Sequence, residues 1–148
     1  MRDPLKGWTR KDATLAGTFD FRSISVKVNA FQDHESALDD ADFMWRSMRE
    51  FSGQTREAPY NTKYGEIKQL SDLGDEAYAI YNEHTVRHNA TAWTYIVRGN
   101  ATIEIRFLGT DNKGREILSD ENSRPVPEEE LLAGLEEIAR EVVNGLTG

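Results

Sequence analysis

The residues whose spacing comes closest to that of a metal site are His84 and His88, in the segment HTVRH. Two histidines four residues apart on a helix can hold a zinc ion, and zinc peptidases have a glutamate directly after the first of them. Here Thr85 stands in that place, and the surrounding residues favour a strand or a loop. On a strand the two imidazoles would lie about 13 Å apart, too far to share one ion. The sequence therefore predicts solvated histidines and no metal site.

Acidic residues gather at two places without the spacing of a metal-binding loop. Asp72, Asp75 and Glu76 surround Gly74, but they lack the alternating oxygen ligands and the distal glutamate of an EF-hand. The acidic residues of 39–42 are expected to form the solvated face of a helix. The sequence has no phosphate-binding glycine loop, no serine nucleophile elbow and no cysteine. We therefore predict no catalytic residue and no cofactor.

A β-hairpin is the clearest structural signal. Residues 93–108 read WTYIVRGNATIEIRFL, in which two runs of β-forming residues meet at Gly99 and Asn100. This pair is typical of a two-residue primed turn, which fixes the register of the two strands. Because side chains alternate along each strand, one face of the hairpin is predicted to be core. That face carries Ile96, Ile103, Ile105 and Phe107.

The opposite face of the hairpin combines aromatic and charged side chains. It carries Trp93 and Tyr95 from one strand and Glu104 and Arg106 from the other. Aromatic residues and arginine are the side chains that most often anchor interfaces. We predict that these four residues bind a ligand or a protein partner. The alternative is that the two aromatic rings pack beneath a helix or loop while the two charged residues pair with neighbours.

Two helices and several strands are predicted around the hairpin. Apolar residues recur at helical spacing over residues 35–51, where Asp33 or Ser36 can cap the helix, and over residues 127–146. Strands are expected at about 23–30, 67–70 and 77–82, and a long loop at 53–66. Tight turns favour antiparallel pairing. The prediction is an α+β fold: a mainly antiparallel sheet of about five strands, flanked by these two helices.

Two further expectations concern the N-terminal part of the chain. Apolar positions change phase near Arg22 and Ser23, which indicates a bulge or two short strands. Residues 1–17 are polar and are expected to form a tether or a loosely packed lead-in. Residues 18–148 are expected to form one domain, because the length suits a single core.

Charge and hydropathy narrow the class of partner. The 148 residues carry a net charge of −8 and no large basic cluster, which argues against a nucleic-acid partner. No apolar run is long enough to span a bilayer, and the first residues lack the apolar core of a signal peptide. A membrane tether outside this chain is compatible with the sequence. We leave open whether the protein is a monomer or a homodimer.

Three segments together resemble small extracytoplasmic domains of actinobacteria that are known as lipoproteins or sensor-domain proteins of unknown function. The segments are SISVKVNAF, LGDEAYAI (73–80) and IVRGNATIEIRF (96–107). In that family a GLGDEAY element precedes a VRxGN hairpin, and a C-terminal helix closes the domain. Receptor-kinase sensor domains and PsbP-like lipoproteins are related, and the resemblance implies a sheet flanked by helices. Two departures are Asp72, where the family usually has glycine, and the absence of cysteine.

The resemblance implies export and a non-catalytic role in binding or sensing, and it transfers no catalytic residue. We therefore expect a secreted or cell-surface domain that binds an unknown small ligand or protein. One alternative is a small α+β enzyme, a hydrolase or isomerase, which would need convergent titratable groups in a pocket. Another is a cytoplasmic accessory or immunity-type protein whose acidity mimics a partner's ligand.

Overall fold

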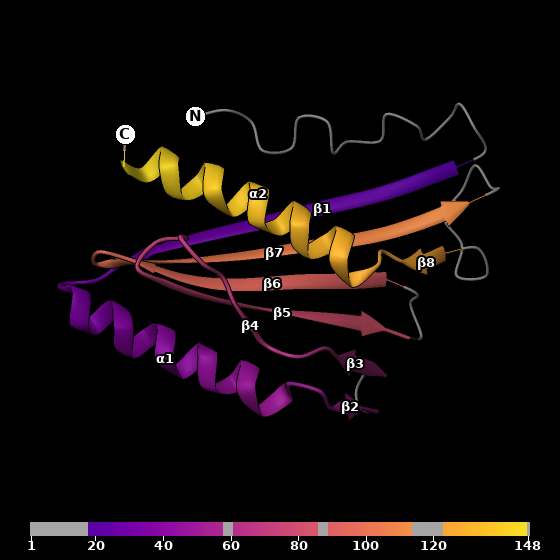
Figure 1. Cartoon of the computed structure of the whole chain (residues 1–148), viewed down its shortest axis with the longest axis horizontal. Helices are drawn as coiled ribbons and strands as arrows, with labels where there is room; N and C mark the ends of the chain where they lie inside the picture. The colour runs from indigo at the N-terminus through magenta and orange to yellow at the C-terminus, as the bar shows by residue number, and fades with distance from the viewer. Residues whose placement is uncertain (1–17, 58–60, 86–88, 114–122, 148) are drawn as a thin grey trace.

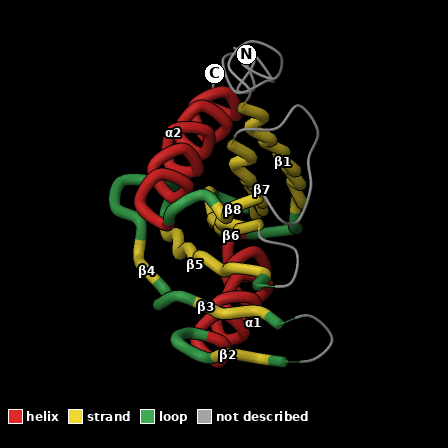
Figure 2. The backbone as a smooth tube through the Cα atoms, turned by 90° about the vertical axis from the view of Figure 1, so that its right-hand side faces the viewer, coloured by secondary structure: helices red, strands yellow, loops and turns green. Residues whose placement is uncertain are grey.

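The sheet lies between two helices, one on each of its faces (Figures 1 and 2). The structure is a computed structural model and describes residues 18–57, 61–85, 89–113 and 123–147. The helices are α1, His34–Phe51, and α2, Glu128–Thr147. The strands are β1 Thr18–Ala30, β2 Thr55–Arg56, β3 Thr62–Tyr64, β4 Lys68–Gln69, β5 Glu76–His84, β6 Asn89–Arg98, β7 Ala101–Lys113 and β8 Ser123–Pro125.

All strand pairs of the described sheet are antiparallel, which confirms the predicted α+β class. The strand order is β1-β7-β6-β5-β3-β2, and the short strands β4 and β8 pair with β5 and β7. The sheet has eight strands where about five were expected. The strands β2, β3, β4 and β8 have only two or three residues each, too few to show an alternating pattern in the sequence.

Two sequence-based predictions are wrong in detail. The predicted bulge near Arg22 and Ser23 is absent, because β1 pairs with β7 in one unbroken register from Thr18 to Ala30. β1 is therefore one continuous strand, and its apolar residues shift from odd positions before Arg22 to even positions after Ser23. Residues 53–66 were expected to be a loop, but they contain β2 and β3. The predicted tether, residues 1–17, lies outside the described residues.

The helices begin and end within one residue of their predicted bounds. The side chain of Asp33 caps α1, since its Oδ1 accepts a hydrogen bond of 2.8 Å from the backbone N–H of Ser36. Neither described helix is long and apolar enough to cross a membrane.

Each helix packs an apolar stripe against one face of the sheet. On the α2 face, the hairpin residues that were predicted to be core are all fully buried, which confirms that prediction. They pack with Leu131, Leu135 and Ile138 of α2. On the α1 face, Trp45 and Met48 of α1 pack with side chains from β5 and β6. Because side chains alternate along a strand, both faces of β6 are covered at its centre.

Candidate functional site

The β6–β7 hairpin brings together all four residues that were predicted to form a binding face. Gly99 has a φ of 58°, as the first position of a primed two-residue turn can require, and the register follows from this turn. Trp93 then lies opposite Arg106, and Tyr95 lies opposite Glu104. Residues that lie opposite each other point to the same side of a sheet, here the α1 side.

Trp93 and its two charged neighbours form a compact polar and aromatic cluster. The indole N–H of Trp93 donates a hydrogen bond of 3.0 Å to Oε2 of Glu104. The guanidinium of Arg106 lies over the indole, 4.8 Å from the ring centroid, and 3.6 Å from the same carboxylate oxygen. Both contacts hold Arg106 in place, although its side chain is 53% exposed. Trp93 itself is only 9% exposed.

Tyr95 lies deeper, beneath α1. It is 4% exposed, and its hydroxyl donates a hydrogen bond to Oδ2 of Asp40 on the helix. Its backbone carbonyl accepts a hydrogen bond of 2.9 Å from the indole of Trp45. Burial, with the hydrogen bond to Asp40, raises the pKa of Tyr95 to about 12. In this arrangement Tyr95 supports the cluster from below and holds α1 against the sheet.

α1 covers only part of its face of the sheet. The helix begins near the hairpin turn, where His34 contacts Gly99, and ends near β3, where the rings of Phe51 and Tyr64 stack at 5.0 Å. It therefore crosses the sheet diagonally, and neither described helix lies above the parts of β1, β6 and β7 farther from the hairpin turn on this side.

We call the uncovered area the open face. Two rows of side chains cross it, and the register of β1, β7, β6 and β5 fixes the members of each row. Most of these side chains are exposed or half-buried. The first row consists of Ser25, Arg106 and Trp93, with Glu104 beside it, and the second consists of Ser23, Leu108, Thr91 and Asn82.

Two asparagines of this face were missed by the sequence reasoning. The side-chain oxygens of Asn82 and Asn89 are buried, yet neither has a hydrogen-bond partner among the described residues. Asn82 lies opposite Thr91, so Asn89 is its diagonal neighbour across β5 and β6. Asparagine is unfavourable within strands. The presence of two asparagines near the strand ends is the sequence feature that could have pointed to these positions. Their oxygens are two buried acceptors without a described partner at the end of this face where β5 and β6 meet the loop between them.

The two histidines that the structure describes do not converge. His34 lies at the start of α1, beside Asp75, and His84 lies at the far end of β5. The nine residues from Asp75 to His84 correspond to roughly 30 Å along a strand. His84 contacts the hydroxyl of Thr62 through Nδ1 at 3.1 Å. His88 lies outside the described residues. Within the described ranges no three His, Asp or Glu side chains are grouped so that they could hold a metal ion.

A small polar pocket of about 130 Å³ lies between β3, β5 and the start of α2. Tyr81 is at its floor and donates a hydrogen bond of 2.6 Å to the carbonyl of Val126. Burial, with the carboxylate of Glu83 beside it, raises the pKa of this phenol. The pocket is smaller than the roughly 300–1,000 Å³ that is typical of small-molecule sites. It is lined by Lys63, Tyr64, Gly65, Tyr81, Glu83 and Glu128.

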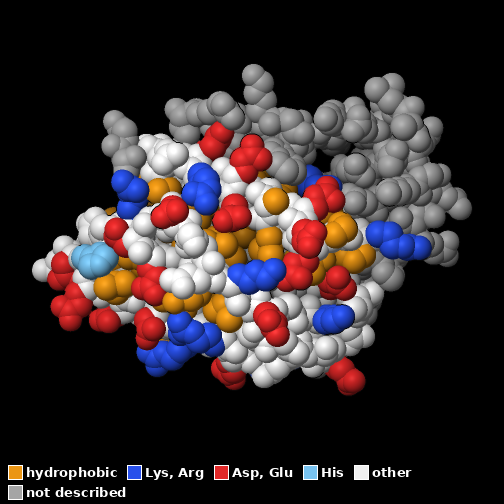
Figure 3. All heavy atoms as spheres, in the orientation of Figure 1, with side chains coloured by type: hydrophobic (Ala, Val, Ile, Leu, Met, Phe, Trp, Pro, Cys, Tyr) orange, Lys and Arg blue, Asp and Glu red, His pale blue; other side chains and the backbone are white. Residues whose placement is uncertain are grey.

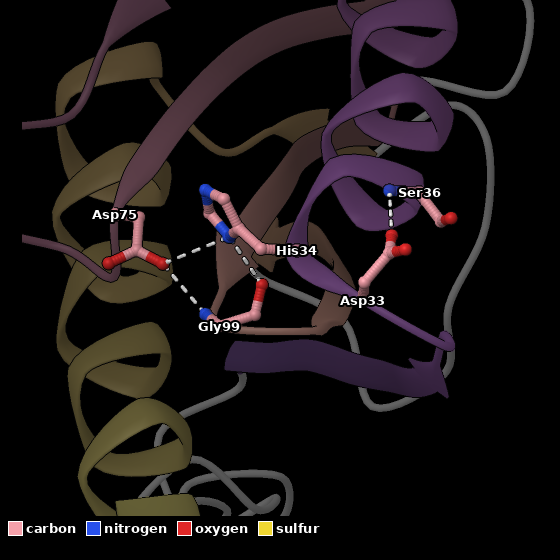
Figure 4. A network of polar contacts seen from close by, with 5 residues as sticks. All are labelled: Asp33, His34, Ser36, Asp75 and Gly99. Carbon is pink, nitrogen blue, oxygen red and sulfur yellow. Dashed lines mark hydrogen bonds and ion pairs between the residues drawn. The ribbon is translucent and has the colours of Figure 1, made fainter.

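The two sequence segments LGDEAY and VRGN meet in a structural joint (Figure 4). Oδ2 of Asp75 accepts a hydrogen bond of 2.7 Å from the N–H of Gly99, and the N–H of Asp75 donates to the carbonyl of Val97. His34 completes the joint, since its Nδ1 lies 2.6 Å from the carbonyl oxygen of Gly99 and must donate to it. These contacts tie α1, β5 and the hairpin turn together. The motifs that carried the resemblance thus hold the fold together.

The face seen in Figure 3 has acidic and basic side chains interspersed around narrow strips of hydrophobic atoms. No single-sign basic area gathers on the visible described surface.

The fold defines the class of protein as an α+β domain with an antiparallel sheet between two helices, and one solved structure shares it. This is the extracellular domain of PknH from Mycobacterium tuberculosis, with a TM-score of 0.58 and 11% sequence identity. The similarity covers 85% of this chain and 56% of that one, so the chain spans about half of the structure that it matches. No protein-family model matches the sequence, and the search of curated proteins found no match.

Proposed function

We propose that this chain is a non-catalytic binding domain that acts outside the cytoplasm, as sensor and lipoprotein-like domains do. The observation that carries the proposal is the open face, where a half-exposed arginine is fixed over a tryptophan at the border between the α1 cluster and the area that the described helices leave uncovered. An arginine held in this way loses little conformational entropy when it contacts a partner. The likeness in fold to an extracellular domain supports a location outside the cytoplasm.

A protein partner suits this surface better than a small molecule. The open face is a sheet surface, and the small pocket near Tyr81 is below the usual size of a ligand site. Protein interfaces are built from broad surfaces of this kind with one or two anchoring residues. In this proposal Arg106, Glu104 and the edge of Trp93 contact the partner, while Tyr95 supports them from beneath α1.

The proposal is tested by photo-crosslinking in the source cells. The photoreactive amino acid p-benzoylphenylalanine replaces Leu108, which lies on the open face two residues after Arg106. A matched control places it at Phe43, which is 66% exposed on the outer side of α1. The expected result is one crosslinked protein from position 108, identified by mass spectrometry, and none from position 43.

Arg106→Ala in the same crosslinking chain is expected to reduce the yield at least tenfold, because the anchoring cation is lost. Arg46→Ala, which removes an exposed arginine that pairs with Asp42 on α1, should leave the yield unchanged. Equal crosslinking from positions 108 and 43, or a yield at 108 that survives Arg106→Ala, would contradict the assignment of the open face. Protease accessibility of the protein in intact cells checks the location independently.

A further inference from the structure

We infer that β1 is a dimerisation edge, through which two copies of this chain pair antiparallel and continue one sheet across both molecules. This inference uses the margin of the sheet and does not depend on the proposed binding role of the open face. The occupant of the edge is a second copy of the same strand, and the argument rests on the exposure of β1 and on its self-complementary sequence.

β1 is a long edge strand without a neighbour on its outer side among the described residues. It is first in the strand order and pairs only with β7 over thirteen residues (Figure 1). Among the described residues no other strand pairs with its outer side, so the outward backbone groups from Ser23 to Ala30 form a template for another strand. Proteins usually protect such edges with proline, a bulge, a short strand or charged side chains such as lysine, and β1 has one lysine in this stretch, Lys27. The described residues of β1 have an unbroken register and no proline.

β1 exposes two apolar side chains, which is unusual for a strand whose edge faces only water. Val26 is 42% exposed and Val28 is 45% exposed, two of the four large hydrophobic side chains that are exposed in the described part of the chain. They point to the α2 side, because they lie opposite Ile105 and Ile103 of that core. α2 therefore leaves these two valines uncovered, and burying them on a second copy is favourable.

A two-fold axis limits the possible registers. When two identical strands pair antiparallel in one sheet, the axis is perpendicular to the sheet, so each residue must face a partner residue on the same side. Even positions of β1 then pair with even positions. A register centred on Val26 places Val26 opposite its own copy and Ile24 opposite Val28 of the second molecule. Three β-branched pairs line up on one side, which is the most favourable type of cross-strand contact.

The same register also suits the polar side. Lys27, which is the one charged residue from Ser23 to Ala30, faces Ser25 of the second copy and lies opposite Glu104 of its own sheet. Moving the centre to Lys27 would place two lysines directly opposite, and moving it to Ile24 would place Arg22 opposite Val26. Both alternatives are less favourable than the register centred on Val26, which is the register that we infer.

The geometry of this dimer keeps both α1 faces on the same side, so the two open faces would form one continuous surface. The paired segment of nine residues is about 30 Å long. An interface of this kind lies near the low end of the roughly 1,200–2,000 Å² that stable complexes bury. We therefore expect a reversible dimer with a dissociation constant on the order of micromolar.

The absence of cysteine from the whole chain allows a register-specific test. Val26→Cys places two thiols opposite each other at the two-fold axis, within the Cα separation that a disulfide spans. Val28→Cys is the matched control, since its two copies would lie roughly 13 Å apart in this register. Mild oxidation of the full chain is expected to give a covalent dimer from Val26→Cys and at most a tenth of that yield from Val28→Cys.

The non-covalent test compares masses in solution by sedimentation velocity over a range of concentrations. The unmodified full chain should shift from monomer to dimer, and Val26→Lys should remain a monomer because it places two charges opposite each other. Phe43→Lys, at the most exposed hydrophobic residue of α1, should dimerise as before. Circular dichroism and thermal unfolding check that each variant is folded.

Three outcomes would overturn the inference. The first is a chain that stays monomeric at all concentrations. The second is a dimer that survives Val26→Lys or crosslinks equally through position 28, since its interface would lie elsewhere or in another register. The third is a monomer that dimerises only after removal of residues 1–17, which would make the chain's own N-terminal segment the occupant of the edge.

Discussion

Gly74 lies just before β5, where the chain passes close to the end of β6. Its φ of 64° is in the left-handed region that favours glycine. A Cβ atom at this position would lie 2.6 Å from the carbonyl oxygen of Val97 and 2.7 Å from Cγ2 of Ile96. The glycine of the LGDEAY segment thus permits Asp75 to reach the hairpin turn.

We expect Gly74→Ala to reduce the free energy of unfolding by about 3 kcal/mol, because backbone strain and a clash with backbone atoms add together. Gly53 is the matched control, since it also has a positive φ, of 74°, but a Cβ there would meet nothing within 4 Å. Gly53→Ala should cost only about 1 kcal/mol. Urea unfolding measures both, and equal losses would show that the close approach to Val97 is unimportant.

Trp93 also shows, at the scale of a single residue, how one aromatic side chain can pack in the core and contact surface residues at the same time. One edge of its indole packs with the α1 cluster, while the N–H and the outer ring face meet Glu104 and Arg106. Its substitution is therefore expected to affect packing and the proposed binding together. Arg106, which is half-exposed, is the residue whose replacement separates the two effects.

At the scale of elements, α1 is held on the sheet by one buried hydrogen bond as well as by apolar contacts. The indole N–H of Trp45 donates to the backbone carbonyl of Tyr95 inside the α1 cluster, and the ring lies edge-on to Tyr78 at 5.0 Å. The carbonyl has no access to water once the helix is docked. Tyr95 also lies in the paired register of β5, β6 and β7, so the cost of losing this donor is that of the buried indole hydrogen bond itself.

We expect Trp45→Phe to lower the free energy of unfolding by about 2–3 kcal/mol, from the lost hydrogen bond and the smaller ring. Trp93→Phe also removes an indole hydrogen bond, but its partner Glu104 lies partly exposed and can be solvated. Its cost should be about 1 kcal/mol. Chemical denaturation of the two variants compares them, and a larger loss for Trp93→Phe would contradict this assignment of the buried contact.

At the scale of the whole molecule, the net charge opposes association. Each chain carries a charge of −8, so a dimer through β1 would carry −16. The interface itself contains little charge, because Lys27 is the single charged residue between Ser23 and Ala30. Long-range repulsion between the two molecules therefore remains without local charge pairs to balance it.

We expect the dimer to become tighter as salt increases, because counter-ions screen this repulsion while apolar pairing is unaffected. The dissociation constant should fall by about threefold to tenfold between low salt and roughly 0.5 M sodium chloride. Sedimentation equilibrium at several salt concentrations measures it. A dimer that weakens with salt would instead indicate an interface of opposite charges, away from β1.

The sequence by itself determined the features that depend on local periodicity. The turn at Gly99 and Asn100 fixed the register of the hairpin, so its buried face and the proximity of the four candidate residues could be predicted. Helical spacing located α1 and α2, and Asp33, one of the two residues that were predicted as possible caps, is the cap of α1 in the structure. These signals act over a few residues, which is why they survive in a single sequence.

Only the tertiary structure decided which parts of the second face are covered. The diagonal path of α1 buries Tyr95 and leaves Arg106 accessible. The alternation of side chains along the strands places both residues on the same face of the hairpin, so it could not tell them apart. Likewise, the strand order left β1 at the margin of the sheet with Val26 and Val28 exposed, where its apolar pattern resembles that of a central strand. Coverage depends on contacts between elements far apart in the chain, and no local pattern encodes it.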